Sequence, residues 1–277
     1  MNNLKYRTIS AIIAILTLVL AIYFFQTKGL EALMYLVVLR GSWEFCRMMI
    51  KNISPPTAPM FVSLINLLFY FFLVQKKIIN FQIDLVLFIM PTMAFVIYGI
   101  LLNSQFKSIQ NISDFIIKSS FSFIYTAFIP ATVTTMLHQK NGIWWFYCML
   151  SVIFAGDIGA YIFGVNWGKQ KIAPQLSPNK SLQGSIGGML FSMFAALCFK
   201  NIWPDLHWSH LILIGLLGGI IGQIGDLFES LVKRVSGVKD SGTIMPGHGG
   251  ILDRIDGVLL AAPLFFALSV FFQYVIN

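Results

Sequence analysis

Charge is scarce in this sequence of 277 residues: Asp, Glu, Lys and Arg make up 11% of it, whereas a soluble domain carries roughly 25%. Cysteine is scarce as well, because the chain has only Cys46, Cys148 and Cys198, which lie far apart in apolar surroundings. Neither a disulfide framework nor a cysteine-based metal site is therefore indicated. Hydrophobic residues, in contrast, reach 57%. This composition predicts an all-α, polytopic integral membrane protein.

Basic residues outnumber acidic ones, giving a net charge of +8, but they are scattered between apolar stretches. A nucleic-acid-binding domain would gather them on one face, so nucleic acid is not expected as a partner. The lipid bilayer, with its anionic headgroups, and phosphorylated substrates are the expected partners. The basic start with Lys5 and Arg7 and the apolar run after it are typical of a signal peptide, but no small-residue cleavage pattern follows. We therefore expect a retained first span.

Apolar stretches predict about nine transmembrane helices, since a spanning helix needs about 20 mainly apolar residues. The expected spans are 7–25, 30–50, 57–75, 80–102, 117–137, 143–165, 182–200, 210–232 and 255–275. Arg40, Glu44 and Arg47 interrupt the second. Residues 1–140 are expected to form scaffold helices and residues 141–277 a catalytic region, within one continuous membrane domain. The long polar interruptions, 166–181 and 233–254, are predicted to be loops that carry the function.

Basic residues are distributed unevenly over the two sides of these spans. With a cytoplasmic N-terminus, the cytoplasmic side receives Lys5, Arg7, Arg47, Lys51, Lys107, Lys118, Lys169, Lys171, Lys180, Lys233, Arg234, Lys239 and Arg254. The opposite side receives Lys28, Lys76, Lys77, Lys140 and Lys200. Because basic residues favour cytoplasmic loops, the N-terminus and a polar active site in the C-terminal half are expected on the cytoplasmic side.

Acidic residues in or beside the apolar spans are the first candidates for function. Asp157, Asp226 and Glu229 lie inside predicted spans, and Asp253 and Asp256 lie at the mouth of the last one. A charged group in a membrane helix costs about 2.5–3.5 kcal/mol even on insertion scales, so such groups tend to face a polar cavity and to serve function. A structural ion pair is the alternative for Asp226.

The eighth span ends in a polar face. Asp226, Glu229, Ser230 and Lys233 follow the spacing i, i+3, i+4 and i+7, which places them along one side of a helix. A solvated helix end is the alternative for Lys233 and Arg234. It does not explain Asp226, which lies deeper in the span.

A glycine-rich segment follows, in which Gly247, Gly249 and Gly250 surround His248. Glycines let backbone N–H groups approach an anion closely, so these glycines are candidate phosphate ligands. Such turns are weak evidence alone, but Lys239, Arg254 and two aspartates flank this one. His248 is either a phosphate donor or a residue that fills the turn.

Three aspartates are the expected metal ligands, with Asp226 and Asp253 as the first choice and Asp256 as the third candidate. Mg²⁺ takes oxygen ligands, often one or two carboxylates together with substrate phosphates. Asp253 and Asp256 are three residues apart and can converge with Asp226 if the last two helices pack together. Asp256 can instead be a charge that the helix N-terminus favours. Zinc is not indicated, because no suitably spaced second histidine or cysteine is present.

A second polar region begins in the sixth span, where Asp157, Tyr161 and Gly164 share one helix face. It continues through a proline-containing stretch, which is expected to form a loop, to Lys180. Lys180 either grips a phosphate or is a surface lysine on the cytoplasmic side. Asp157, Tyr161 and Lys180 are therefore candidate substrate ligands.

Together these motifs resemble the signature of the phosphatidate cytidylyltransferases, also called CDP-diacylglycerol synthases. The resemblance is carried by Ser230-Leu-Val-Lys233-Arg234, Lys239-Asp240-Ser-Gly and Pro246-Gly-His248-Gly-Gly-Ile-Leu-Asp253-Arg254-Ile-Asp256, with Gln223-Ile-Gly-Asp226 and Gly156-Asp157 before them. It is strong from about Asp157 onward and general in character before it. By analogy with the family, a bacterial inner membrane is expected.

The resemblance implies transfer of CMP from CTP to phosphatidate, giving CDP-diacylglycerol and pyrophosphate in phospholipid biosynthesis. It implies Mg²⁺, optionally with a second, monovalent cation, and a homodimer is a further candidate state. Asp226, Asp253 and Asp256 are then expected to bind metal. Lys233, Arg234, Lys239, His248 and Arg254 are expected in catalytic, phosphate-binding roles, and Asp157, Tyr161, Lys180, Ser230, Gly247, Gly249 and Gly250 in substrate binding.

One motif departs from the family pattern. That pattern usually reads Ser-Pro-Lys-Lys-Thr, an aromatic residue and Glu-Gly, whereas this chain has Ser177-Pro178-Asn179-Lys180-Ser181-Leu182-Gln183-Gly184. One lysine and one carboxylate are replaced. Two alternatives therefore stay open: a related CTP-dependent enzyme with another lipid acceptor, and a non-catalytic relative. A transporter is disfavoured, because the polar groups cluster in one half of the chain without a repeated mate.

Overall fold

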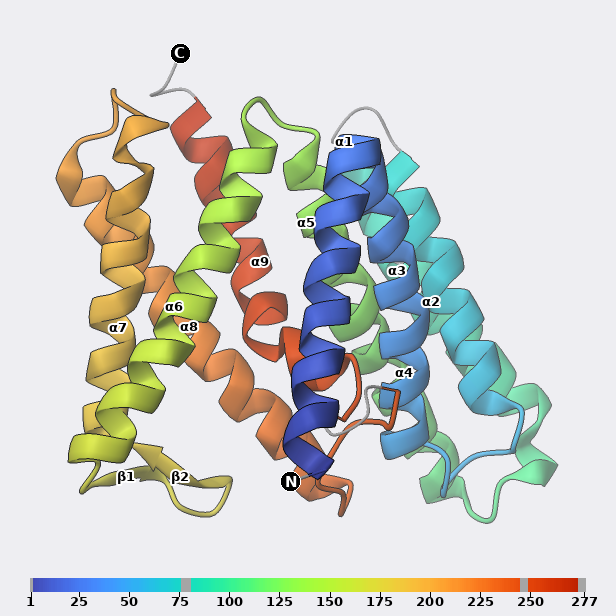
Figure 1. Cartoon of the computed structure of the whole chain (residues 1–277). Helices are drawn as coiled ribbons and strands as arrows, with labels where there is room; N and C mark the ends of the chain where they lie inside the picture. The colour runs from blue at the N-terminus through green and yellow to red at the C-terminus, as the bar shows by residue number, and fades with distance from the viewer. Residues whose placement is uncertain (1, 76–80, 245–248, 274–277) are drawn as a thin grey trace. The chain divides into compact units, whose positions relative to one another are not determined.

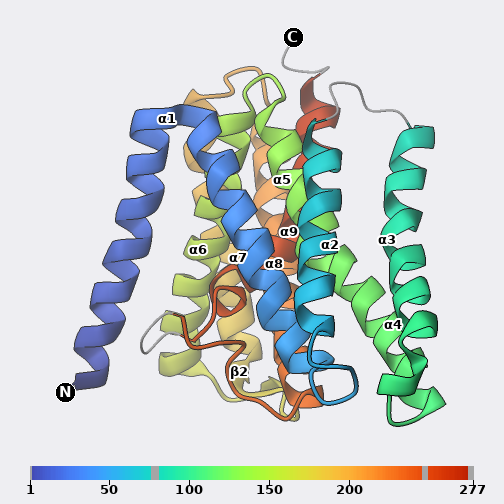
Figure 2. The ribbon, with the colours of Figure 1, turned by 90° about the vertical axis from the view of Figure 1, so that its right-hand side faces the viewer.

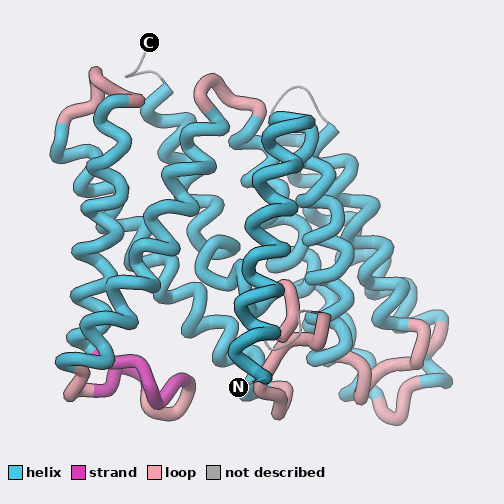
Figure 3. Tube along the Cα trace, in the orientation of Figure 1, coloured by secondary structure: helices cyan, strands magenta, loops and turns pink. Residues whose placement is uncertain are grey.

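The computed structural model describes residues 2–75, 81–244 and 249–273. Helices make up most of this part of the chain, with one short pair of strands (Figure 3). The chain divides into two compact units, each described here by itself. The first unit comprises Met1–Thr134 with Ser236–Arg254, and the second comprises Thr135–Val235 with Ile255–Asn277.

The first unit is built from helices that are far longer than its connecting turns. They are α1 (Asn2–Met49), α2 (Ala58–Gln75), α3 (Phe81–Leu101), the short η1 (Asn103–Gln105), α4 (Ile109–Phe123), the π-helical turn η2 (Ile124–Phe128) and α5 (Ile129–Leu137), which reaches the unit boundary. Residues 236–254 complete this unit, although they follow α8 in the sequence.

Helix α1 is two helical arms joined at a sharp kink, and Figure 2 shows the second arm folding back beside the first. The kink lies at Gln26, whose φ of 50° and ψ of −130° are not helical. Close by, a Cβ on Gly29 would lie 2.2 Å from the carbonyl oxygen of Ala21, so the reversal needs glycine there. The predicted spans 7–25 and 30–50 therefore both lie within α1, on opposite sides of the kink.

Helices α4, η2 and α5 run on without a break, so this span begins earlier than the sequence predicted. The expected start was residue 117, but α4 begins at Ile109, capped by the Ser108 side chain, which accepts a hydrogen bond from the backbone N–H of Asn111 at 3.1 Å. The early turns contain polar residues, which lower the local hydropathy and conceal a helix of this length.

The π turn of η2 lies beside a buried polar contact that joins three helices. The Asn66 side chain of α2 donates hydrogen bonds to the hydroxyl groups of Ser42 at 3.2 Å and Ser122 at 3.0 Å. Ser42 also pairs with Thr126 at 2.6 Å. Such hydrogen bonds between side chains hold membrane helices together, because lipid offers their polar groups no partner.

The second unit contains four long helices and a hairpin. Its elements are α6 (Gly142–Trp167), β1 (Lys171–Ala173), β2 (Ser177–Ser181), α7 (Leu182–Leu197), η3 (Cys198–Asn201), α8 (Trp208–Val235) and α9 (Leu252–Gln273), of which this unit holds the part from Ile255. The strands β1 and β2 pair antiparallel, with Lys171 opposite Ser181. The prediction of a plain loop over 166–181 is therefore wrong: the segment forms a small hairpin at one end of α6 and α7 (Figure 1).

Small residues let α6, α7 and α8 approach closely. A Cβ on Gly159 of α6 would lie 2.6 Å from the carbonyl oxygen of Gly187 in α7. A Cβ on Gly219 of α8 would lie 2.7 Å from the hydroxyl oxygen of Ser192 in α7. Close backbone approach at glycines is a common way for helices to associate in a membrane, where lipid removes the hydrophobic drive between them.

Among the described residues, seven helices are long and apolar enough to cross a membrane. They are Leu16–Met49, Ala58–Gln75, Ile109–Leu137, Gly142–Trp167, Leu182–Asn201, Trp208–Val235 and Leu252–Gln273, with Leu85–Leu101 as a shorter apolar helix. The prediction of an all-α, polytopic membrane protein is confirmed. The predicted number of nine spans stays a prediction, because α1 with its kink counts here as one helix and only the part Leu85–Leu101 of α3 is counted, as a shorter apolar helix.

Candidate active site

Four carboxylates from three helices gather in the second unit, and we call them the carboxylate cluster: Asp157 of α6, Asp226 and Glu229 of α8, and Asp256 of α9. Asp157 lies within electrostatic range of Asp226 and Asp256. Asp256 in turn lies within electrostatic range of Asp226 and close to Glu229. The sequence predicted function at Asp157, Asp226 and Asp256, and the structure brings these three together.

Two lysines partly neutralise the cluster. The Lys180 ammonium of β2 lies 2.5 Å from a carboxylate oxygen of Asp226, and the Lys233 ammonium lies 3.5 Å from one of Glu229. Glu229 is almost fully buried, with 1% of its side chain exposed, whereas 37% of Asp226 is exposed. The cluster thus has four acidic and two basic groups, and of its acids Asp157 is exposed, Asp226 and Asp256 are partly buried and Glu229 is buried.

Helix geometry explains why these acids meet. On α8, Asp226, Glu229 and Lys233 lie one turn apart in succession, which also places Glu229 and Lys233 in ion-pair range. Between α8 and α9, a Cβ on Gly225 would lie 2.6 Å from the carbonyl oxygen of Asp256. The two backbones can touch only because residue 225 is glycine, and this contact carries Asp256 to the level of Asp226.

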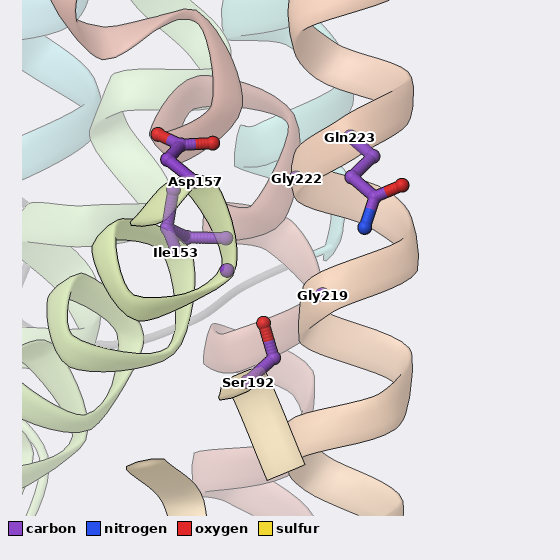
Figure 4. Close-up of a pocket in the computed structure, with 7 residues that line it drawn as sticks. Ile153, Asp157, Ser192, Gly219, Gly222 and Gln223 are labelled. Atoms are coloured by element: carbon purple, nitrogen blue, oxygen red, sulfur yellow. The ribbon is translucent and has the colours of Figure 1, made fainter. Parts of the chain in front are cut away.

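A narrow pocket lies directly beside the cluster. It is lined by residues of three helices: Ile153, Gly156 and Asp157 from α6, Ser192 from α7, and Gly219, Gly222 and Gln223 from α8 (Figure 4). The pocket leaves essentially no space for a water-sized molecule. Gln223 is held there by Ser185 of α7, whose backbone oxygen accepts from the Gln223 amide at 3.1 Å. The pocket is therefore too small for a nucleotide, and Asp157 lies in its wall.

The hairpin end of this unit is basic and well fixed. Ser181 caps α7 by accepting from the backbone N–H of Gly184 at 3.2 Å. The Arg234 guanidinium donates to the carbonyl oxygen of Leu176 at 3.3 Å, which ties the end of α8 to the hairpin. Lys180 reaches the cluster from the same hairpin. Lysines and arginines at this end suit an anionic ligand.

Gln183, the departure from the family pattern, has a clear position in this hairpin. Its side-chain oxygen accepts hydrogen bonds from the backbone N–H groups of Lys169 at 3.0 Å and Gln170 at 3.3 Å. It thus closes the turn that leaves α6. A glutamate oxygen can accept the same two bonds, so the amide preserves this part of the local structure.

Tyr161 and Ser230, two predicted substrate ligands of this unit, have no part in the contacts described above for the carboxylate cluster. Tyr161 is 72% exposed and is not among the residues that line the pocket. Ser230 is partly buried on α8. Their predicted roles stay predictions.

In the first unit, Asp253 organises the predicted phosphate-binding segment. One of its carboxylate oxygens accepts three hydrogen bonds, each of 2.8 Å, from the backbone N–H of Ser241, the hydroxyl of Ser241 and the backbone N–H of Gly250. Asp253 is also the acid in the first turn of α9, where the helix dipole favours it. From the sequence alone, the role of a charge at the helix N-terminus was an alternative for Asp256, which lies one turn later.

The glycines of this segment lie against acidic side chains of the same chain. Gly249 has a φ of 85°, and a Cβ there would lie 2.4 Å from the Asp253 carboxylate. The backbone N–H of Gly250 donates its hydrogen bond to the Asp253 carboxylate, an acid of the chain itself. Phosphate binding by Gly249 and Gly250 stays a prediction, and Gly247 and His248 lie outside the described residues.

Glu44 is the residue that sequence reasoning missed. It is 2% exposed, and its carboxylate accepts from the backbone N–H of Leu252 at 3.2 Å and the hydroxyl of Ser241 at 3.3 Å. The sequence had noted Glu44 only as an interruption of an apolar span. The high cost of a buried acid in such a span was the signal that marked it.

The remaining predicted cations, Lys239 and Arg254, are exposed in the first unit, where they are accessible to an anion. The predicted convergence of Asp226 with Asp253 joins residues of both units and stays a prediction.

The carboxylate cluster fits a magnesium ion by its chemistry. Mg²⁺ prefers oxygen ligands and is often held by one or two protein carboxylates plus substrate phosphates. In the described part of the chain, no group of three or more His, Cys, Asp or Glu side chains is arranged to hold a metal ion. A magnesium site with one or two protein carboxylates is compatible with this finding and stays the prediction.

The membrane-length helices and the carboxylate cluster define a polytopic membrane protein with a charged site. The family model described as "Cytidylyltransferase family" matches residues 5–272, and the chain belongs to this family. It is 30% identical over 287 residues to the phosphatidate cytidylyltransferase of Bacillus subtilis (strain 168), covering 98% of this chain and 100% of that protein.

Two further relatives are similar to this chain over different lengths. The phosphatidate cytidylyltransferase of Staphylococcus haemolyticus (strain JCSC1435) is 34% identical over 280 residues, which cover 94% of this chain and 97% of that protein. The uncharacterized protein YnbB of Escherichia coli (strain K12) is 38% identical over 150 residues, which cover 54% of this chain and 50% of that protein.

Proposed function

We propose that this chain transfers CMP from CTP to phosphatidate, giving CDP-diacylglycerol and pyrophosphate. The observation that carries the proposal is the carboxylate cluster with its two lysines, formed by three helices of a chain in the cytidylyltransferase family. Full-length relatives that are named phosphatidate cytidylyltransferase support this choice of nucleotide and acceptor.

The reaction needs positioning and charge neutralisation more than proton transfer. A phosphate oxygen of phosphatidate, already ionised near neutral pH, forms a bond to the α-phosphorus of CTP. The bond from that phosphorus to the oxygen bridging to the β-phosphate breaks, and pyrophosphate leaves with the electron pair. No strong general base is required. The protein must hold two anions together and stabilise the charge of the transition state.

In this proposal Asp226 and Asp256 hold Mg²⁺, which would neutralise phosphate charge when bound, and Asp253 keeps its predicted role as a metal ligand. Lys180, Lys233 and Arg234 lie beside the cluster or on the same end of the unit, so they suit the triphosphate or the lipid phosphate. Lys239 and Arg254 are proposed for the same task. A monovalent second cation and a homodimer are further expectations of the family resemblance.

The reaction is proposed to take place at the cytoplasmic side of a bacterial inner membrane. Within the second unit, Lys180 and Arg234 belong to the hairpin end, as the positive-inside tendency expects of a cytoplasmic end. Labelling of single cysteines introduced at Lys171, in the hairpin, and at Asp205, before α8, tests this. Only Lys171→Cys should be protected from an impermeant reagent in right-side-out vesicles, and the reverse pattern contradicts the orientation.

The decisive experiment is an assay of the protein purified in detergent with labelled CTP, phosphatidate and a series of divalent cations. CDP-diacylglycerol and pyrophosphate should form in equal amounts, only with a divalent cation, and stop when a chelator is added. Absence of product with every cation contradicts the proposal. Product with another lipid phosphate, but none with phosphatidate, would identify a related enzyme with a different acceptor, the alternative that Asn179 and Gln183 leave open.

A further inference from the structure

The buried carboxylate of Glu44 lies in the second arm of α1, almost 200 residues before the segment that it contacts. Its oxygen Oε2 accepts from the backbone N–H of Leu252 at 3.2 Å and from the Ser241 hydroxyl at 3.3 Å. Its oxygen Oε1 forms an ion pair with the Arg40 guanidinium at 3.2 Å. Glu44 thus bridges a helix and both ends of the 241–252 segment.

A buried charge is stabilised only where partners surround it, since the loss of hydration otherwise costs several kcal/mol. The Arg40 guanidinium, one helical turn away and 33% exposed, supplies the counter-charge. The Leu252 N–H is one of the first donors of α9, which has no partner within the helix. Glu44 therefore occupies a site that the start of α9 leaves open for an acceptor.

Two glycines of the segment are shaped to this acid. A Cβ on Gly242 would meet three Glu44 atoms first, at 2.6, 2.8 and 3.1 Å. A Cβ on Gly250 would lie 2.2 Å from the Ser241 hydroxyl oxygen and 2.4 Å from Oε2 of Glu44. The side chain of Glu44 therefore requires glycine at both positions.

Ser241 links Glu44 to Asp253. Its hydroxyl lies 3.3 Å from Glu44 Oε2 and 2.8 Å from Asp253 Oδ2, and its backbone N–H donates to the same Asp253 oxygen. A hydroxyl has one proton, so the two carboxylates share it, with the closer Asp253 favoured. A change at Glu44 therefore reaches the hydrogen bonds that orient Asp253.

We infer that Glu44 is a positioning residue. It acts through Ser241 and Leu252 to fix the orientation of Asp253 and the position of Arg254 in the first turn of α9. This inference rests on the proposed function, in which Asp253 and Arg254 handle metal and phosphate. Glu44 itself touches neither substrate nor metal. Its effect should be on the concentration of Mg²⁺ that the enzyme requires and on turnover.

The first experiment compares Glu44→Gln with the wild type in the purified, full-length protein. Glutamine keeps the size, but in either orientation its NH2 group faces a donor, the Arg40 guanidinium or the Leu252 N–H, and the charge that pairs with Arg40 is lost. The Mg²⁺ concentration for half-maximal rate should rise on the order of 10–100-fold, as for other residues that orient ligands. Partial unfolding lowers only the active fraction and leaves the half-saturating Mg²⁺ concentration unchanged. Glu31→Gln, an acid-to-amide change in the same helix, is the matched control.

The second experiment tests the contact without turnover. Thermal unfolding in detergent is measured for Gly242→Ala, Glu44→Ala and the double variant. Gly242→Ala should lower the unfolding temperature when Glu44 is present and much less when it is absent, because the added methyl group meets the Glu44 side chain first. An equal loss in both backgrounds means that the contact is absent and overturns the inference.

The outcomes separate the two proposals. A wild-type half-saturating Mg²⁺ concentration and kcat in Glu44→Gln overturn the positioning role while leaving the proposed function intact. A wild type that makes no CDP-diacylglycerol under any condition overturns the proposed function and the role that depends on it, and the unfolding measurements still report the contact. A raised Mg²⁺ requirement together with the non-additive unfolding result supports the inference.

Discussion

The Lys180 ammonium lies 2.5 Å from the Asp226 carboxylate and so occupies the place of a cation beside a proposed metal ligand. The lysine comes from a short strand and the acid from a membrane helix, so the hairpin and α8 are joined by charge. When a divalent ion binds Asp226, it must compete with Lys180. The displaced ammonium is then available to a phosphate of the substrate.

Removal of this ammonium should therefore separate metal binding from turnover. In Lys180→Met, Mg²⁺ should bind the substrate-free protein a few-fold more tightly, since a partly exposed ion pair contributes about 0.2–1 kcal/mol. The kcat should fall, because a phosphate ligand is lost. Calorimetric titration and steady-state rates measure the two effects, with Lys171→Met, an exposed lysine of β1, as the control. Weaker Mg²⁺ binding would contradict the competition.

The carboxylate cluster should be essential. Asp226→Asn and Asp256→Asn each remove a negative charge from the proposed magnesium site, so kcat should fall by at least about 100-fold. Thermal unfolding of both proteins should stay close to that of the wild type. Asp205→Asn, at an exposed acid before α8, is the matched control and should keep the wild-type rate. A near-normal rate in either cluster variant removes that residue from the metal site.

Gln183 should tolerate glutamate but not an apolar residue. Its oxygen accepts two backbone hydrogen bonds at the turn after α6, which Gln183→Glu can keep and Gln183→Leu cannot. The loss of hydrogen bonds from two N–H groups should cost Gln183→Leu about 1–3 kcal/mol of unfolding free energy. Gln183→Glu should keep the stability, measured by thermal unfolding. A large gain of kcat in Gln183→Glu would show that a carboxylate there also serves the reaction.

Helix packing in the second unit should be sensitive to one methyl group. In Gly159→Ala the added methyl meets the Gly187 carbonyl at 2.6 Å, so the variant should lose about 1–3 kcal/mol of stability. Gly164→Ala on the same helix is the control, because its nearest neighbour is 3.6 Å away, and a helical alanine is favoured over glycine by about 1 kcal/mol. Equal unfolding temperatures in the two variants would contradict the close packing of α6 and α7.

The sequence predicted the helices well because apolar length is a local property. The two spans of α1, including the break near residue 26, follow from two apolar runs with polar residues between them. The start of α4 at Ile109 was missed because its first turns are polar, and the β1–β2 hairpin was missed because strands this short leave little periodicity.

The candidate site was predictable to the extent that helix spacing determines it. The face of α8 that carries Asp226 and Glu229 follows from residue numbers alone. The pairing of Lys180 with Asp226 and the contact of Glu44 with Leu252 do not, because each joins residues that are distant in the sequence. The partner of a buried acid depends on tertiary packing, which no periodicity reports.

The segment 236–254 interrupts the second unit in sequence but belongs to the first in space. During synthesis, helices α1 to α4 are therefore already made when this segment emerges. The hydrogen bond between Ser241 and Glu44 then closes a loop of nearly 200 residues. Contacts of such separation form late and slowly, since the chain must first lose the freedom of the intervening loop. A fragment that begins at α6 would contain the carboxylate cluster yet leave Ser241 and Leu252 without their partner, so the gene should not divide into two independently active halves.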